Sequence, residues 1–362
     1  MSLQLDWTED ELLATHKVVE PLMAGGIKCH GGFDDGGAYV SPRTANRWTA
    51  IENWEKHRVE TFGTPILEIP LETWPENYPN VAQAKYLLDE GVREPLISSL
   101  TRIGTVEGFG AYLRYSPIPN LQQSFDDDVS GTALAHLGGG LFEAHARDEA
   151  GFEDEGGHKQ MWFAARDVAF EHPVTTDQTE LMLQRMGISG SPGSAPSGLM
   201  PTATLPDIEH DLEFLIARMA NLLLIEISAF HVFAWAEEFL CDTDLTAGDG
   251  DAARLVSYIR VDETPHVEYL KTTLSEMRDR TFVGKSGKKY PGTQVVGQLW
   301  DAAVKSSLGE RREQNLKLTL REVEHALDGN PRGAEILEGF HAKGSIRPTV
   351  DGSWEPVQPA AY

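Results

Sequence analysis

Two short stretches of the sequence share one pattern: Asp-Glu-Gly-Gly-His at residues 154–158 and Asp-Glu-Thr-Pro-His at residues 262–266. The spacing Glu-x-x-His occurs four times, but an Asp precedes the Glu only in these two copies, where roughly a tenth of a copy is expected by chance. Residues three apart share one face of a helix, so a carboxylate and an imidazole can reach the same metal ion. The preceding Asp can orient the His by accepting a hydrogen bond from its other nitrogen. The pattern predicts the ligands Glu155, His158, Glu263 and His266, supported by Asp154 and Asp262.

The most apolar helical pattern, at residues 208–240, carries one conspicuous carboxylate. Glu226 lies in Leu-Leu-Leu-Ile-Glu-Ile-Ser-Ala-Phe at residues 222–230. Burying an ionised, unpaired Glu there would cost several kcal/mol, so Glu226 must be protonated, paired or bound to a metal. The 37 residues from Glu226 to Glu263 suit two antiparallel helical arms and a turn. We therefore expect Glu226 to be a third carboxylate ligand.

A fourth carboxylate is expected on the first long helix. Glu107 lies in the apolar stretch Arg-Ile-Gly-Thr-Val-Glu-Gly-Phe-Gly-Ala-Tyr-Leu at residues 102–113. Glu143 and Glu149 are the alternatives. Glu143 precedes Glu155 by 12 residues, about 18 Å along a continuous helix, so the two could share one ion only if that helix breaks. Glu107 is preferred.

Hydrophobic periodicity predicts a mostly helical chain. The long helices are expected at residues 81–114, 132–170, 208–240 and 251–280, followed by helices at 293–327 and 333–342. A Gly/Ser/Pro-rich stretch at 187–207 is typical of a long crossover connection. Shorter helices are expected at 8–22 and 44–57, on either side of a Gly-rich loop or hairpin at 25–43. Gly156, Gly157 and Pro265 interrupt the helices close to the expected ligands.

These residues resemble the ligand set of ferritin-like di-iron carboxylate proteins. The twin Asp-Glu-x-x-His motif is most similar to that of the oxidase and oxygenase members, such as bacterial multicomponent monooxygenase hydroxylases. The resemblance implies a ferritin-like four-helix bundle at residues 81–280, an N-terminal extension packed on the bundle at 1–80, and C-terminal helices with a Pro-rich tail at 281–362. It implies that one iron is held by Glu107, Glu155 and His158 and the other by Glu226, Glu263 and His266, with catalytic roles for Glu226 and Glu263 and outer positions for Asp154 and Asp262.

The resemblance implies an enzyme that uses O2 to hydroxylate, desaturate or N-oxygenate a small organic substrate at two non-haem iron ions. The N-oxygenase branch adds a third His one turn before the last Glu; that position is Ile259 here, although His231 could substitute from the third helix. Electrons are expected from a separate reductase or ferredoxin, because the sequence contains no evident flavin or iron–sulfur motif. The alternatives are a manganese/iron or dimanganese centre, and a metal-binding bundle that is not catalytic.

Composition limits the other classes. The 362 residues are 41% hydrophobic and 24% charged, with a formal net charge of −25, which argues against nucleic acids and anionic membranes as partners. Two cysteines cannot form a disulfide framework, and the N-terminus lacks the pattern of a secretory signal. Charged and polar residues interrupt the apolar stretch at 214–236, which favours a buried helix over a membrane span. We expect a cytoplasmic protein, and a homodimer is a further expectation.

Overall fold

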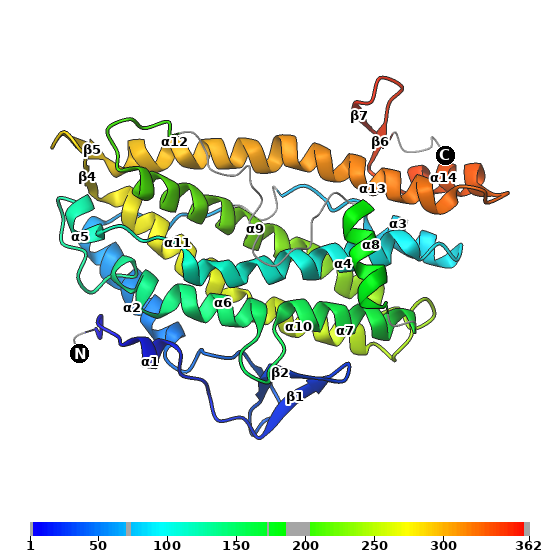
Figure 1. Cartoon of the computed structure of the whole chain (residues 1–362), viewed down its shortest axis with the longest axis horizontal. Coiled ribbons are helices and arrows are strands. Elements are labelled where there is room, and N and C mark those ends of the chain that lie inside the picture. Colours follow the sequence, from blue (N-terminus) through cyan, green and yellow to red (C-terminus); the bar gives the residue numbers. More distant parts are fainter. Residues whose placement is uncertain (1–2, 70–73, 172–173, 186–202, 358–362) are drawn as a thin grey trace.

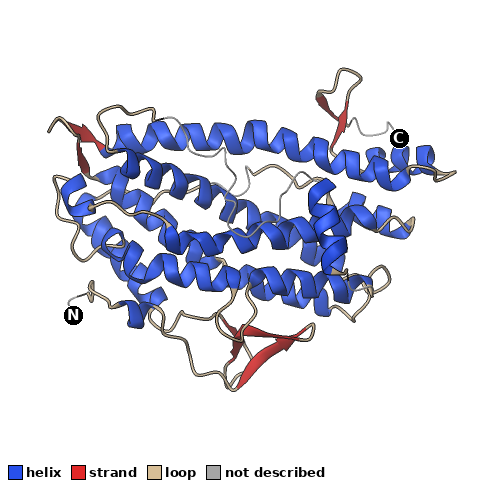
Figure 2. Ribbon diagram, in the orientation of Figure 1, coloured by secondary structure: helices blue, strands red, loops and turns tan. Residues whose placement is uncertain are grey.

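Four helical rods form the centre of the molecule. The computed structural model describes residues 3–69, 74–171, 174–185 and 203–357, and this part of the chain is mostly helical (Figures 1 and 2). The rods consist of α4 (Glu94–Glu107) with the 3-10 helix η2 (Gly108–Tyr115), α6 (Phe142–Ala150) with α7 (His158–Phe170), α9 (His210–Leu240), and α10 (Asp251–Asp262) with α11 (Thr264–Asp279). Helix α7 packs against α4 and α10, α9 packs against α10 and α11, and α6 packs against η2. The mostly helical class is thus confirmed.

Helix α9 is the core element of this arrangement. Its side chains enter both large apolar clusters of the molecule, for example Ile216 in one and Phe233 in the other. Among the described residues it is also the single helix long and apolar enough to cross a membrane by length and composition, and half of its most apolar window is buried. Because other helices cover that apolar surface, burial in the core explains its composition, as the sequence predicts.

Three of the predicted long helices are interrupted. The expected helix at 81–114 is divided at residues 90–93, between α3 (Val81–Asp89) and α4. The expected helix at 132–170 is broken by a kink at Gly139 and Gly140, between the turn η3 (Leu134–His136) and α6, and again by residues 151–157. The expected helix at 251–280 is divided at Glu263, and Pro265 lies in the first turn of α11. Proline fits there because the first turn of a helix needs no backbone donor.

The N-terminal residues cover one face of the rods. Thr8 forms the expected capping box with Glu11, but α1 spans only Glu9–Leu12, and the predicted helix at 8–22 is wrong beyond that point. A small antiparallel sheet follows, with β2 (Ile27–Phe33) between β1 (Glu20–Ala24) and β3 (Tyr39–Val40). Helix α2 (Arg47–Phe62) then packs against α11, and β2 contacts α7. These elements bring residues 30–47 close to the rods.

The C-terminal residues form a fifth long rod. Helix α12 (Gly292–Lys305), a π-helical turn (Ser306–Arg311) and α13 (Arg312–Leu327) follow one another along one line (Figure 1), and α14 (Gly333–Ala342) follows. These bounds confirm the helices expected at 293–327 and 333–342. Helix α12 packs against α9, and α13 packs against α4.

The remaining elements are short. They are α3 (Val81–Asp89), α5 (Leu121–Ser124), α8 (Thr176–Arg185), and the hairpins β4 (Thr281–Val283) with β5 (Lys289–Pro291) and β6 (Ile346–Pro348) with β7 (Trp354–Pro356). Most of the predicted crossover at 187–207 lies outside the described residues.

Candidate metal centre

Histidine and carboxylate side chains from all four rods meet between the rods in two groups, and a third cluster, His30, His158 and Asp262, adjoins them. In each group the potential ligand atoms lie within 4.8 Å of one another. The first group consists of Glu107, Glu149, His158 and Glu263, and the second of His145, Glu149, Glu226 and His266. Glu149 belongs to both groups, so the two lie side by side. Glu107 is the least buried of these side chains, with 9% of it exposed.

Five of the expected ligands come together in these groups: Glu107, His158, Glu226, Glu263 and His266. Glu155 and Asp154 do not. Their side chains are 30% and 76% exposed, and both interact with Lys28 near the protein surface. The expectation that Glu155 is a ligand and Asp154 its neighbour in the site is therefore wrong, and Glu149 and Asp148 take their places.

The reason is a six-residue excursion inside the second rod. Helix α6 ends at Ala150, Gly151 turns the chain outward with a φ of +83°, and α7 begins at His158. A Cβ atom on Gly157 would lie 2.2 Å from the backbone nitrogen of Gly151, so the two ends of the excursion almost touch. If residues 151–156 are set aside, the rod reads Asp148-Glu149-Ala150-Gly157-His158, which is the Asp-Glu-x-x-His motif.

The sheet holds this excursion in place. The backbone nitrogen of Gly156 donates to the carbonyl of Lys28 on β2 at 2.6 Å, and Phe152 and Glu155 exchange backbone hydrogen bonds across the turn. Glu155 therefore lies in a β-like turn and not on a helix, and it loses the helical spacing to His158 on which the prediction depended. The sequence contains a signal for Glu149, because Asp148-Glu149 repeats the dipeptide six residues before Asp154-Glu155.

His145 is a further site residue that sequence reasoning missed. It lies one turn before Glu149 on α6, fully buried, and its ring stacks on that of His266 with centroids 3.7 Å apart. Its Nδ1 lies 3.0 Å from the hydroxyl of Tyr269, and its Nε2 faces Glu149 at 3.5 Å and Glu226 at 3.4 Å. His145 thus lies one turn before Glu149, whereas the resemblance implies a third His one turn before Glu263. His231 stacks on Trp74 instead and belongs to neither group.

The two Asp residues support the His of the opposite motif. Asp148 lies 2.9 Å from the Nε2 of His266, and Asp262 lies 3.4 Å from the Nε2 of His158. Each Asp therefore reaches across to the other rod. When Nε2 donates its proton to the Asp, the lone pair of Nδ1 points toward the carboxylates. The expected role of Asp262 is supported by this geometry, with a different His as its partner.

Asp148 is held by two buried arginines from the N-terminal residues. Arg43 Nε donates to it at 2.7 Å and Arg47 at 3.0 Å, and all three side chains are nearly or fully buried. Burial opposes ionisation of Asp148, but the charges of Arg43 and Arg47 and the contact with His266 hold its pKa well below the ordinary value. Asp148 is therefore ionised and able to fix the His266 ring.

Asp262 has a comparable set of partners. The hydroxyl of Tyr39 donates to it at 2.8 Å, and His30 lies 3.5 Å away. Burial alone would raise the pKa of Asp262, but its interactions with His158 and His30 lower it to about 2. Residues 30–47, from β2 to the start of α2, thus supply the outer contacts of both Asp residues.

The carboxylates Glu149 and Glu263 span the two groups. One oxygen of Glu263 lies 2.8 Å from His158 Nδ1, and the other lies 2.6 Å from His266 Nδ1. Glu149 likewise directs one oxygen to His158 at 3.4 Å and the other to His266 at 3.5 Å. This is the arrangement expected of carboxylates that bridge two ions.

The residues present fit a pair of metal ions. His158 Nδ1 and Glu263 Oε1 are buried and face each other at 2.8 Å, and neither has a further hydrogen-bond partner among the described residues. The same holds for the buried atoms Glu107 Oε2, Glu149 Oε2 and His145 Nε2. Buried polar atoms without partners are rare in folded proteins. A cation between them would satisfy these atoms together.

The pKa shifts reflect how closely the carboxylates and imidazoles are packed. Burial opposes the charged forms of His145 and His158, but Tyr269 and Glu149 raise the pKa of His145, and Glu149 and Glu263 raise that of His158, well above the ordinary value. Burial, followed by the charge of Glu149, raises the pKa of Glu107 to about 8 and that of Glu263 well above its ordinary value. Burial and the neighbouring His145 lower the pKa of His266 to about 4, so its ring is neutral, as a ligand must be. Without a cation, the raised pKa values of Glu107 and Glu263 mean that these carboxyls hold protons, which relieves the repulsion between the carboxylates. Two divalent ions would balance the charges of all four carboxylates in their ionised form.

Comparisons with protein-family models, with curated proteins and with solved structures give no match for this chain. Buried acidic and His residues able to hold metal ions in a mostly helical protein are therefore the features on which a functional assignment rests.

Proposed function

We propose that this chain is a ferritin-like dinuclear iron protein that uses O2 to oxidise a small organic substrate. The observation that carries the proposal is the pair of adjoining ligand groups, which share Glu149 and lie between four helical rods. Ferritin-like di-metal proteins place carboxylates and Glu-x-x-His pairs from four helices around two ions. Once the excursion at 151–156 is set aside, both rods with His158 and His266 carry that pair.

The donor set favours iron or manganese. It consists of carboxylate oxygens and imidazole nitrogens, with no thiolate in either group, which suits iron and manganese better than metals that seek sulfur. Glu107, Glu149, His158 and Glu263 would hold one ion. His145, Glu149, Glu226, Glu263 and His266 would hold the other. Iron is proposed, and manganese in one or both positions is the alternative.

When bound, two ferrous ions would supply the redox chemistry that activates O2. In hydroxylation, desaturation and N-oxygenation alike, O2 takes four electrons, two from the substrate and two from an external donor. The sequence has no evident site for a flavin or an iron–sulfur cluster. A separate reductase or ferredoxin is therefore proposed as the electron donor.

The chain itself contributes orientation and a dry site. Asp148 and Asp262 hold the His266 and His158 rings so that Nδ1 of each ring points inward. Arg43 and Arg47 keep Asp148 ionised, and the buried Glu226 side chain is held on the most apolar helix of the molecule. Exclusion of water strengthens each of these electrostatic contacts.

A cavity of about 310 Å³ adjoins the site, and its wall includes Glu107 together with residues of α4, α9 and α13. This volume lies at the lower end of the range found for small-molecule sites. A protein that only stores or carries metal has no need of such a cavity beside one of its ligands. The cavity therefore favours an enzyme over a metal-binding bundle without catalysis.

The test is the metal content of protein expressed with iron, followed by O2 uptake after chemical reduction. We expect about two iron ions per chain in the wild type, and loss of at least one in Glu149→Ala and Glu226→Ala. Glu155→Ala is the matched control, because it removes the same side chain from the neighbouring Asp-Glu pair, and it should keep both ions. Wild-type protein without bound metal, or reduced iron-loaded protein that does not consume O2, would overturn the proposal.

A further inference from the structure

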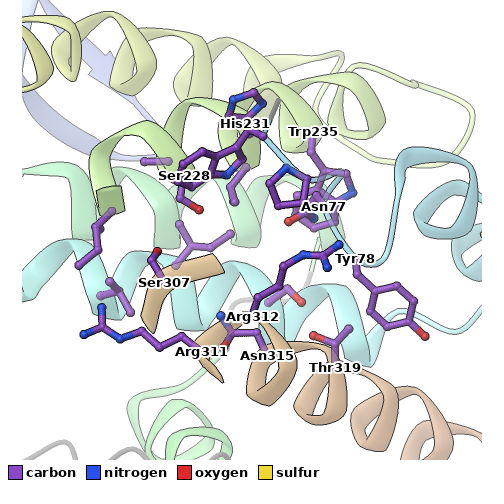
Figure 3. Close-up of a pocket in the computed structure, with 18 of the residues that line it drawn as sticks. Asn77, Tyr78, Ser228, His231, Trp235, Ser307, Arg311, Arg312, Asn315 and Thr319 are labelled. Atoms are coloured by element: carbon purple, nitrogen blue, oxygen red, sulfur yellow. The ribbon is translucent and has the colours of Figure 1, made fainter. Parts of the chain in front are cut away.

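The cavity beside Glu107 has a wall that the proposed metal chemistry does not explain. It lies between α4, α9, residues 74–78 and the C-terminal rod. From the rod it receives Ser307, Leu308, Arg311, Arg312, Asn315 and Thr319, whose spacing of three and four residues puts most of them on one helix face. Figure 3 shows the side chain of Arg312 directed toward Asn77 and Trp235 and that of Ser307 directed toward Ser228 on α9.

A π-helical turn at Ser306–Arg311 shapes this face. It is the one irregular turn in a rod that otherwise runs as α-helix from Gly292 to Leu327. Turns of this kind change the facing of the residues that follow, and they occur often at functional sites. Here the turn ends at two consecutive arginines, and both line the cavity.

Arg312 has no hydrogen bond or ion pair to any described residue, and half-burial removes part of its water. Figure 3 shows its side chain crossing the cavity toward Asn77 and Trp235, whereas Arg311 extends along the opposite side. The two acidic residues of the wall interact with other partners than Arg312. Glu76 accepts a hydrogen bond from Ser345, and Glu107 belongs to one of the metal groups. A partly buried guanidinium without a counter-ion is unfavourable, and this one has no partner among the described residues although the chain has a net charge of −25. An anion from outside the chain would provide the missing counter-ion.

The remainder of the wall is apolar. Three of its aliphatic side chains, Val106, Ile225 and Leu308, are among the large hydrophobic residues that the chain leaves exposed, at 37–40%. Two buried polar atoms in the wall, His231 Nε2 and Trp235 Nε1, also lack partners among the described residues. The cavity therefore offers an apolar body contact, a few polar contacts and the guanidinium groups of Arg311 and Arg312, of which Arg312 crosses it.

We infer that this cavity binds a carboxylic acid with an apolar body, whose carboxylate is held by Arg312 and whose body extends toward Glu107. The inference rests on the proposed function, since it names the substrate class of the same site. A guanidinium binds a carboxylate through two parallel hydrogen bonds, which gives orientation as well as affinity. Such an anchor would fix which end of the substrate faces the metal groups.

Binding of probes without turnover tests the inference. The probes are 4-phenylbutyrate and the straight-chain carboxylates from hexanoate to dodecanoate, each paired with its primary amide and titrated calorimetrically into the full chain under anaerobic conditions. At least one carboxylate should bind about tenfold or more tightly than its amide, as expected for a charge-assisted pair. If no carboxylate binds better than its amide, the inference is overturned.

Variants then assign the anchor. Arg312→Gln should remove the preference for carboxylate over amide, and Arg312→Lys should keep part of it, because Lys retains the charge without the two-pronged geometry. Arg321→Gln, an exposed position on the same helix outside the cavity wall, should leave the preference unchanged. An unchanged preference in a folded Arg312→Gln protein would overturn the assignment. Because iron content and O2 uptake are measured separately, failure of the proposed metal chemistry would be distinguishable from failure of carboxylate binding.

Discussion

Each imidazole that faces the two metal groups is fixed by a partner on its far side. His266 has Asp148, His158 has Asp262, and His145 has Tyr269. The partners of the two Asp residues come from the N-terminal residues, whose expected role was only to cover the bundle. The chain therefore uses residues 30–47 to set the electrostatics of a site that lies on other elements.

Tyr39 provides a residue-scale test of this outer support. Its hydroxyl donates to both oxygens of Asp262, at 2.8 and 2.9 Å. Tyr39→Phe removes that donor and leaves the ring in place, so metal affinity should fall by about tenfold while the fold is retained. Competition with a chelator of known affinity measures the change. Tyr258→Phe is the control, because its ring stacks on Tyr39 at 4.4 Å without touching Asp262, and an equal loss in both variants would contradict the argument.

At the scale of elements, the sequence predicts which residue types form the site better than it predicts where the helices are interrupted. Five residues of the two groups are predictable from sequence because each is a His or Glu in an unusual setting, such as Glu226 within an apolar helix. Glu149 was weighed only as an alternative to Glu107, because the spacing Glu-x-x-His assumes an unbroken helix. The six-residue excursion at 151–156 separates Glu149 from His158 in the sequence, but its ends meet, so the two side chains still lie one helical turn apart in space. The Asp-Glu pair inside the excursion, at 154–155, matches the Asp-Glu-x-x-His pattern in the sequence without lying in the site.

The close contact between Gly151 and Gly157 yields the next prediction. Gly157→Ala would place a Cβ 2.2 Å from a backbone nitrogen, so the ends of α6 and α7 must separate. The free energy of unfolding should fall by about 1–3 kcal/mol, as for other overpacked sites, and His158 should move away from Glu149 with loss of bound metal. Urea unfolding and metal analysis report the two effects.

Gly297→Ala is the matched control for this variant. Gly297 lies in α12, and a Cβ there would meet no atom within 4 Å. Replacing Gly by Ala inside an exposed helix stabilises it by about 0.5–1 kcal/mol. A Gly157→Ala protein with unchanged stability and metal content would show that the two ends of the excursion can separate without disturbing the site.

At the scale of the whole molecule, α2 is tied to α11 by a buried ion pair. Arg58 on α2 donates to Asp279 at the end of α11, and Thr64 donates to the same carboxylate at 2.8 Å. Burial opposes ionisation of Asp279, but hydrogen bonds from Arg278, Arg58 and Thr64 lower its pKa below the ordinary value. A carboxyl of lowered pKa adds stability above the pKa of the unfolded chain, about 4, and that stability is lost as pH falls through the folded-state pKa.

Asp279→Asn tests this connection and its pH dependence. At pH 7 the variant should be less stable by about 3 kcal/mol, because it leaves the buried guanidinium of Arg58 without its counter-ion. The difference from the wild type should begin to shrink as the pH falls below about 4, the pKa of the unfolded chain, and should vanish as the pH falls through the lower folded-state pKa of Asp279. Urea unfolding at several pH values measures it. Asp251→Asn, which removes an exposed pair with Arg254, should change stability by less than about 1 kcal/mol; a difference that stays constant with pH would contradict the argument.

Metal removal is the test that involves all four rods. Without cations, the carboxylates Glu107, Glu149, Glu226 and Glu263 must lie together in a buried site. There burial, followed by the charge of Glu149, raises the pKa of Glu107 and of Glu263. Two bound ions would replace the repulsion between the carboxylates by attraction and would connect all four rods, from α4 to α11. A ligand that binds only the folded state stabilises it in proportion to the logarithm of its concentration over its Kd. Chelation should therefore lower Tm by several degrees, as a loss of a few kcal/mol does in a chain of this size.

The same experiment distinguishes a metal centre from a cluster stabilised by protons. In Glu226→Gln, one of the four charges is already absent, so the metal-free protein should be more stable than metal-free wild type, while the gain in Tm on adding ferrous iron should be smaller. Calorimetry of both proteins with and without iron gives the four values needed. If chelation leaves the wild-type Tm unchanged, the buried carboxylates are satisfied by protons and their neighbouring His residues, and the rods need no metal to pack.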